Sequence, residues 1–329
     1  MANIYQNDAD RIRREGRQER SDRQERSDHQ ERSKRPISGS AVARIVIWSI
    51  VFFLLLGVFS MAMLGDFLGT VIISNGQIHL GAWAYDDDEY VIGNGTVQTA
   101  IREISVDWVA GSVTVEPTDG ERIVIADDYS GDHDAYRLRW SVEDGELSVK
   151  YCKPSLKTAF FDSDSVSKNL TILIPKSMLD EVDEVYISTF SADQNIRVSA
   201  ERLELEAVSG EISIAGEYDH VQIETVSGDV RFGGDLKDIA IDAVSANVEL
   251  SLHERQANRI RLDAMSGNLR VILPESTTGF RVESDNLKDD VEVRGFTLER
   301  RGSSWGDGRM RIDMDGVSST LVIEKRMDE

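Results

Sequence analysis

The chain has almost no cysteine, because Cys152 is the only one among 329 residues. No intramolecular disulfide can form, which suits a bacterial surface, where folds of this size do not depend on disulfides. No second cysteine or histidine lies near Cys152 in the sequence to support a reactive thiol. We therefore expect Cys152 to be a buried, small apolar residue beside Tyr151 in a strand.

Motifs for catalysis and metal binding are also missing. The five histidines include no pair at i,i+4, and the chain has no HExxH motif, Gly-x-Ser-x-Gly elbow or glycine-rich phosphate loop. His133 could bind a metal with Asp127 and Asp128, but a polar loop is the interpretation we favour. We predict no catalytic residue, no cofactor-binding residue, no metal ligand and no enzymatic activity.

Positive charge is scarce in most of the chain. From Asp66 onward the chain contains 26 Lys and Arg residues and 51 Asp and Glu residues. Such an acidic segment excludes nucleic acid as a partner and keeps a domain soluble beside a charged wall or membrane. The four acids at 86–89 lack the ligand spacing of a calcium loop and predict a solvated acidic loop.

The chain has one long apolar run, residues 45–64, which contains twenty residues without a charge. At 1.5 Å per residue it can cross the ~30 Å hydrocarbon layer, so we predict a transmembrane helix over 44–65. Lys and Arg lie just before the run and are absent from the twenty residues after it. This asymmetry predicts a cytoplasmic N-terminus and an extracytoplasmic C-terminal domain. A cleaved signal peptide is the alternative, but the long leading segment favours an uncleaved signal-anchor.

The segments on either side of this run have little apolar periodicity. Residues 1–40 contain ten basic and eight acidic residues, and a charged hexapeptide recurs at 17–22, 23–28 and 29–34. We predict a mostly disordered cytoplasmic tail, and a docking tail for a partner or for anionic lipid is the alternative. Residues 66–100 are rich in Gly and Asn-Gly and predict a linker.

Residues 101–329 have the pattern of an all-β domain. Apolar residues alternate with polar ones from Ile104 to Trp108, and the alternation returns after each cluster of Gly, Pro, Asp or Asn. Asp144-Gly145 predicts a two-residue hairpin. Residues 152–168 predict a long loop, and 177–184 and 254–257 offer at most a turn or two of helix.

A serine signature recurs inside this domain. Ser209, Ser227, Ser245 and Ser266 are 18, 18 and 21 residues apart, and a fainter copy at Ser191 lies 18 residues earlier. A fixed period indicates one structural unit stacked on itself. The step from each inward residue before the signature to the one after it is five residues, so a bend must absorb one residue to keep both halves inward. Gly follows the serine in most copies, but Ala246 shows that a positive φ is not strictly required.

These observations predict a β-solenoid, a β-helix-like stack of 18–21-residue repeats, with like residues above like at a spacing of about 4.8 Å. An antiparallel meander or sandwich is the alternative, but it needs tighter hairpins than the segment 216–220 offers. A strand pair at 310–314 and 320–324 is expected to close the domain, and residues 317–319 between them echo the repeat.

The repeat Ile-x-Ala-Val-Ser-Gly-x-Ile-x-Ile over 186–274 and the stretch 104–116 resemble a bacterial adhesin family, a domain of unknown function with β-strand repeats. The resemblance covers about 100–325. It implies a cell-envelope location behind one membrane segment, a link to envelope-stress systems in some members, and no recognised catalytic residues.

We therefore expect a non-enzymatic, membrane-anchored cell-envelope protein whose ectodomain is a binding, adhesion or scaffolding module. Its expected partners are the membrane and an envelope polymer or a membrane protein. An accessory of an envelope-stress signalling system is the alternative. A β-helix carbohydrate-active enzyme is a weaker one, since acids at regular outward positions are typical of a solvated face. Those acids are Glu204, Glu206, Glu211, Glu224, Asp229, Asp242, Glu249 and Asp263.

Overall fold

The computed structural model of the chain describes residues 71–74, 77–80, 85–153, 167–283, 291–296 and 304–326, with the backbone alone for 71–80. The chain divides into two compact units, Met1–Phe67 and Leu68–Glu329, and all described residues belong to the second. Among them, no helix is long and apolar enough to cross a bilayer. The predicted span at 44–65 and the predicted tail at 1–40 lie outside the described residues.

The described part of the second unit is mostly β-strand, which confirms the all-β prediction. Its only helices are the short 3-10 turns η1 (Asp87–Glu89), η2 (Asp134–Tyr136) and η3 (Lys176–Glu181). The strands are β1 (Val71–Ser74), β2 (Gln77–Leu80), β3 (Val91–Ile92), β4 (Gly95–Val97), β5 (Glu103–Thr118), β6 (Ile123–Asp127), β7 (Arg139–Glu143), β8 (Glu146–Lys150), β9 (Lys168–Pro175), β10 (Glu184–Ile196), β11 (Ala200–Ser209), β12 (Ile212–Leu252), β13 (Arg259–Leu273), β14 (Gly279–Glu283), β15 (Val291–Arg294), β16 (Ser304–Gly306) and β17 (Met310–Lys325).

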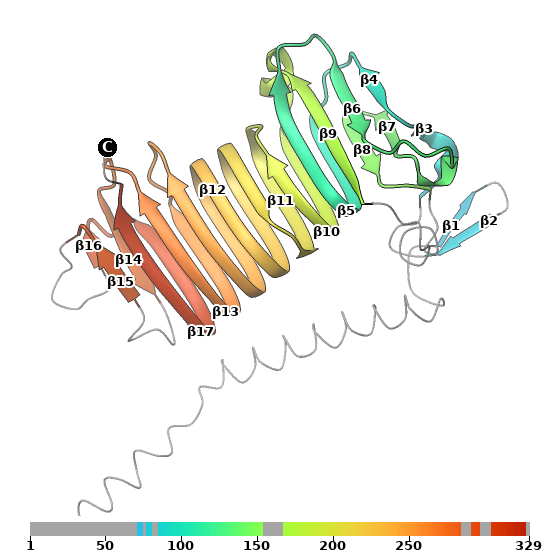
Figure 1. The fold of residues 1–329 in the computed structure, drawn as a ribbon. Coiled ribbons are helices and arrows are strands. Elements are labelled where there is room, and N and C mark those ends of the chain that lie inside the picture. Colours follow the sequence, from blue (N-terminus) through green and yellow to red (C-terminus); the bar gives the residue numbers. More distant parts are fainter. Residues whose placement is uncertain are drawn as a thin grey trace, which may run out of the picture. The chain divides into compact units, whose positions relative to one another are not determined.

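Six long strands form the middle of the main sheet. β5, β10, β11, β12, β13 and β17 lie side by side in this order, and neighbouring strands pair in parallel (Figure 1). The serine signature sets the register, since Ser191 pairs with Ser209 and Ser209 with Ser227. Ser245, Ser266 and Ser318 pair in the same way further along. Parallel pairing at these offsets contradicts an antiparallel meander in this region.

The register stacks identical kinds of residue inside the domain. Ile187 pairs with Leu205 and Leu205 with Ile223, and all three are completely buried. Because side chains alternate with a period of two, a slip of one residue would move every such row to the outer face. Burial of these rows therefore excludes a slip of one residue between neighbouring repeats.

The bend at the signature absorbs one residue, as the five-residue step predicts. Ala207 and Ile212 are both buried, whereas Val208 between them is 39% exposed. At Gly210, φ is +130°, and a Cβ would lie 2.4 Å from the carbonyl oxygen of Ala192 in the preceding repeat. Close approach of the two backbones thus requires glycine in this copy.

The N-terminal end of the sheet is built by shorter strands. β7 and β8 form the predicted hairpin, with Glu143 opposite Glu146 and a positive φ at both Asp144 and Gly145. Residues 85–100, predicted as part of a linker, instead belong to this end, because β3 and β4 pair with β7 and β6 and because Tyr85 and Val97 are buried.

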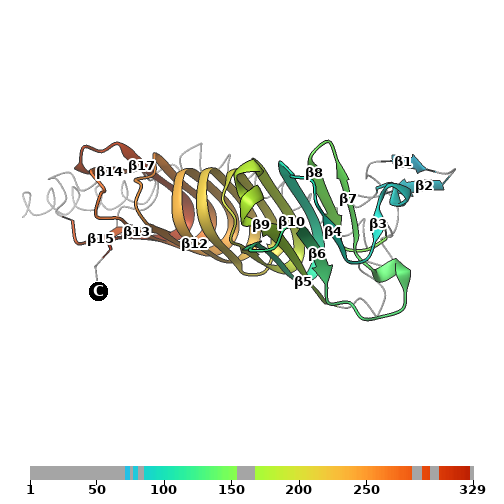
Figure 2. The same ribbon diagram turned by 90° about the horizontal axis from the view of Figure 1, so that it is seen from above.

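The C-terminal end differs from the expected closing strand pair. Residues 310–325 form one strand, β17, which continues the repeat register of β13 rather than folding back. β14 and β15 pair in parallel with β17 (Figure 2). β16 pairs antiparallel with β14 (Figure 1). The bend at 316–319 therefore acts as a further copy of the signature, as the echo of the repeat at 317–319 predicted.

Candidate binding pocket beside a buried lysine

Lys168, the first residue of β9, is a lysine almost completely removed from solvent. Its side chain is 1% exposed, and its Nζ lies 3.0 Å from Oδ2 of Asp127, whose side chain is 5% exposed. The ammonium also donates hydrogen bonds to the carbonyl oxygens of Tyr136, at 2.8 Å, and Tyr151. Buried lysines are rare unless they are paired, and this one joins β9 to the end of β6 and to two further segments.

Aromatic rings complete the surroundings of this ammonium. Nζ lies 4.2 Å from the ring centre of Tyr151, 4.8 Å from that of Trp108 and 5.9 Å from that of Tyr129. The indole Nε1 of Trp108 donates to the carbonyl oxygen of Lys168 at 2.9 Å. Burial lowers the pKa of Lys168, and Asp127 opposes that shift. The ion pair, the carbonyls and the ring faces together favour the cationic form.

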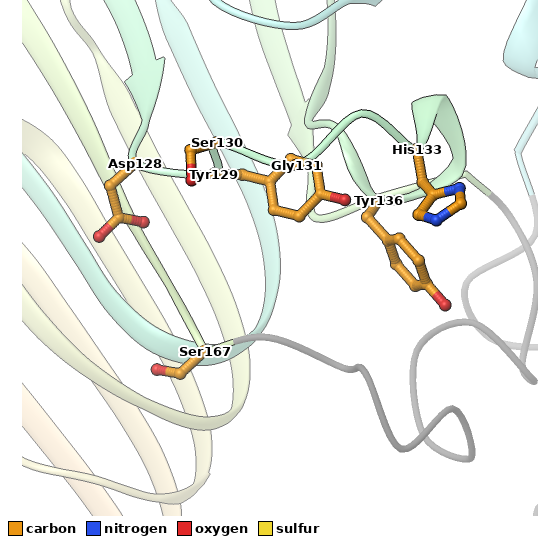
Figure 3. A pocket seen from close by; sticks show the side chains of 7 residues that line it. All are labelled: Asp128, Tyr129, Ser130, Gly131, His133, Tyr136 and Ser167. Atoms are coloured by element: carbon orange, nitrogen blue, oxygen red, sulfur yellow. The ribbon is translucent and has the colours of Figure 1, made fainter.

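A pocket lies against the segment that contains Tyr129 and Tyr136. Its volume is about 370 Å³. Figure 3 shows the rings of Tyr129, His133 and Tyr136 gathered on one side of it. The ring centres of Tyr129 and Tyr136 are 6.2 Å apart, and those of His133 and Tyr136 are 5.9 Å apart. The pocket is lined by Asp128, Tyr129, Ser130, Gly131, His133, Tyr136 and Ser167.

Several contacts position these walls. The Asp128 carboxylate accepts hydrogen bonds from the backbone N–H and the side-chain amide of Asn169, at 2.9 and 2.7 Å. Tyr136 is held through its carbonyl by Lys168. A Cβ on Gly131 would lie 2.3 Å from the hydroxyl of Tyr129, so the absence of a side chain leaves room for that ring. The segment between β6 and β7 is therefore tied to β9 at both of its ends.

The structure does not bring His133, Asp127 and Asp128 together as metal ligands. Asp127 faces Lys168, Asp128 faces Asn169, and His133 packs edge-on against Tyr136. No group of three or more His, Cys, Asp or Glu residues within the described ranges could hold a metal ion.

Cys152 is buried, as the sequence predicted, but it lies in a bend after β8 and not in a strand. Burial raises the pKa of its thiol to about 11, against the opposing effects of Lys168 and Arg139. Its backbone carbonyl accepts a hydrogen bond of 2.5 Å from the hydroxyl of Tyr85. The residue thus contributes to packing at the N-terminal end of the sheet.

The outward acids lie in rows across the strands rather than converging at one point. Glu206 pairs with Glu224, and Asp242 pairs with Asp263, which pairs with Asp315. Burial and the neighbouring Asp263 raise the pKa of Asp242. In adjacent rows Glu249 and Glu211 form ion pairs with Arg270 and Arg231, and Asp229 accepts a hydrogen bond from Asn247. Burial also raises the pKa of Glu204, which lies in a further row.

Sequence reasoning considered His133 and Asp128, which line this pocket, only as metal ligands, and it missed Lys168, Tyr129 and Tyr136. Lys168 has the same parity as the buried Leu170 and Ile172, so the alternation of β9 already pointed its side chain inward. Tyr129 and Tyr136 had no such signal, because they lie outside any strand and their contacts come from distant segments. The pocket depends on contacts between segments that are distant in the sequence, and a local sequence pattern cannot predict such contacts.

Comparison with known families agrees with the repeat pattern. Residues 101–306 match the model of the family described as Toastrack DUF4097, which is more than half of the chain. The chain belongs to the Toastrack DUF4097 family. No curated protein matches it significantly.

Three solved structures are similar to this Toastrack chain over 72% of its length. A "putative adhesin" from Bacteroides fragilis is 10% identical and covered over 97% of its own chain, with a TM-score of 0.38. A "putative lipid binding protein" from Parabacteroides distasonis is 12% identical and covered over 97%, with a TM-score of 0.34. A "putative cell adhesion protein" from Clostridium sporogenes is 10% identical and covered over 100%, with a TM-score of 0.27. These TM-scores are too low to support an argument about this chain.

Proposed function

We propose that this Toastrack protein is a non-enzymatic binding module of the bacterial cell envelope. The pocket beside Lys168 is the observation that carries the proposal. It is lined by three rings and several polar groups, and two lining residues, Asp128 and Tyr136, are held by hydrogen bonds from Asn169 and Lys168. Preformed pockets with aromatic walls and a few polar groups are typical of small-molecule and sugar recognition.

The repeat stack supports the same proposal. We infer that β5, β10, β11, β13 and β17 are rungs of a β-solenoid and that β12, which contains both Ser227 and Ser245, supplies two rungs, because equivalent residues pair in parallel from one repeat to the next. Such a stack is rigid along its length and suits the presentation of a binding site. Its outward carboxylates lie in rows and partly in ion pairs with arginine, an arrangement that favours a charged platform over an acid–base pair.

We also propose that the module is anchored by a single span at 44–65, with residues 1–40 in the cytoplasm. The uncharged run at 45–64 and the distribution of Lys and Arg around it support this topology. A direct test uses the full-length chain with one epitope at each end in a bacterial host. Protease added to intact cells should remove the C-terminal epitope and spare the N-terminal one, and protection of both epitopes would contradict the topology.

A second experiment tests the binding role. Full-length protein in detergent should sediment with isolated bacterial envelopes, and the heat-unfolded protein should not. Absence of sedimentation with any envelope fraction would overturn the proposed function. Cross-linking in the native membrane adds an independent readout, because recovery of a membrane kinase alone would replace a binding role with an envelope-stress accessory role.

A further inference from the structure

The pocket beside Lys168 also limits the charge of what it can bind. Asp128 lines it, and Asp132 and Asp134 lie exposed in the same connection between β6 and β7. An anionic ligand would meet these carboxylates in a domain that is already strongly acidic. The structure therefore disfavours phosphate, uronate and other negatively charged groups at this site.

A cation is disfavoured by a different set of contacts. The ammonium of Lys168 lies 5.9 Å from the ring centre of Tyr129, so a second positive charge at that ring would be repelled. The Asp128 carboxylate already accepts two hydrogen bonds from Asn169, and the Asp127 carboxylate is paired with Lys168. The remaining compatible chemistry is an uncharged ligand with both apolar and hydroxyl-bearing faces.

We propose that this pocket binds a neutral carbohydrate unit of an envelope or cell-surface glycan. A sugar ring presents C–H groups on one face, and the electron-rich face of a tyrosine attracts them. Tyr129 and Tyr136 supply such faces, while Ser130 and Ser167 supply hydroxyls within the same lining. The His133 ring forms a third wall at 84° to Tyr136 (Figure 3). This inference rests on the proposed binding function and names its ligand class.

The test uses full-length protein in detergent and three soluble probes, of which two are neutral and one is anionic. These are a neutral N-acetylglucosamine tetramer, a neutral maltotetraose and an anionic tetragalacturonate. Calorimetry or saturation-transfer NMR should detect binding of at least one neutral probe and none of the anionic one. Preference for tetragalacturonate, or no binding of either neutral probe up to millimolar concentration, would overturn the proposal.

Variants then locate the site. Tyr136→Ala should weaken binding of the neutral probe about tenfold, as expected for loss of one stacked ring, and Tyr136→Phe should retain it. Gly131→Ala should also weaken binding, because its Cβ would displace the Tyr129 ring. His133→Ala removes the third ring of the lining. Its control is His220→Ala, which changes an exposed histidine on the repeat stack and should have no effect on binding of the neutral probe. Equal affinities for Tyr136→Ala and His220→Ala would exclude this pocket as the sugar site.

The two proposals fail in distinguishable ways. If the wild-type protein sediments with envelopes and Tyr136→Ala sediments equally well, the module binds elsewhere and only the sugar inference is wrong. If neither protein sediments but the neutral probe still binds the wild type, the pocket is a sugar site without an envelope role. Circular dichroism of each variant, compared with the wild type, separates lost binding from lost folding.

Discussion

Gln194 donates a hydrogen bond of 2.9 Å from its side-chain amide to the hydroxyl of Thr189, inside the core of β10. Both residues are buried, and the Oε1 atom of Gln194 has no hydrogen-bond partner. In the next repeat the equivalent positions are the apolar Ala207 and Ile212. Thr189 and Gln194 thus form a polar pair at positions where the next repeat has an apolar pair.

We expect these two residues to be energetically coupled. Thr189→Ala should lower the free energy of unfolding by about 1 kcal/mol, because the Gln194 amide loses a partner. Adding Gln194→Ile should recover that loss, since the double variant reproduces the apolar pair of the next repeat. Urea denaturation of the four proteins of the cycle measures the coupling, and strictly additive losses would contradict it.

The second prediction concerns the buried ion pair. Lys168→Met should lower the free energy of unfolding by about 3–5 kcal/mol, because it leaves the Asp127 carboxylate buried without its partner. The matched control is Lys176→Met, which breaks the ion pair between Lys176 and Asp119. The side chain of Lys176 is 62% exposed and that of Asp119 is 90% exposed. That change should cost less than about 1 kcal/mol. Similar losses for the two variants would show that Lys168 is not a structural anchor.

The third prediction uses the row of carboxylates and its pH dependence. Burial, and then the neighbouring Asp263, raise the pKa of Asp242 above its ordinary value. The folded state therefore holds this proton more tightly than the unfolded state, so stability falls as the pH rises from 3.8 through the raised pKa.

Asp242→Asn removes this cost, so the variant should be more stable than the wild type at pH 7.5. Its advantage should shrink when both are measured near pH 4. Thermal unfolding at the two pH values measures the difference, and Asp180→Asn, at an exposed site in η3, is the control. A constant advantage at both pH values would point to a cause other than protonation.

The fourth prediction concerns the bend at the serine signature. Gly210→Ala should lower the free energy of unfolding by about 3 kcal/mol, the upper end for backbone strain, because φ is +130° and the new Cβ would meet the carbonyl of Ala192. Ala246→Gly at the equivalent position should cost only about 1 kcal/mol. Chemical denaturation compares them, and a reversed order of the two losses would refute the role assigned to close backbone approach.

The sequence predicted the parts of this fold that depend on local periodicity. Alternation and the 18-residue serine spacing anticipated the strands, the bend and the Asp144-Gly145 hairpin, because each is set by side-chain parity or turn chemistry. The predicted linker at 66–100 included residues 85–100, which belong to the sheet end, because short strands such as β3 contain too few residues for a period of two to appear. The pocket was missed because Lys168, Tyr129 and Tyr136 meet only after β6, β8 and β9 have packed.

The position of the pocket has a mechanical consequence. The pocket lies between β6 and β7, and the chain enters the same end of the sheet through Tyr85, whose hydroxyl is bonded to the carbonyl of Cys152. If the proposed ligand is held in this pocket and the proposed anchor precedes Tyr85, tension between the two is carried by the first strands alone. Strands β10 to β17 then lie outside the loaded part of the chain, so the ligand can be pulled from the pocket while these strands stay paired.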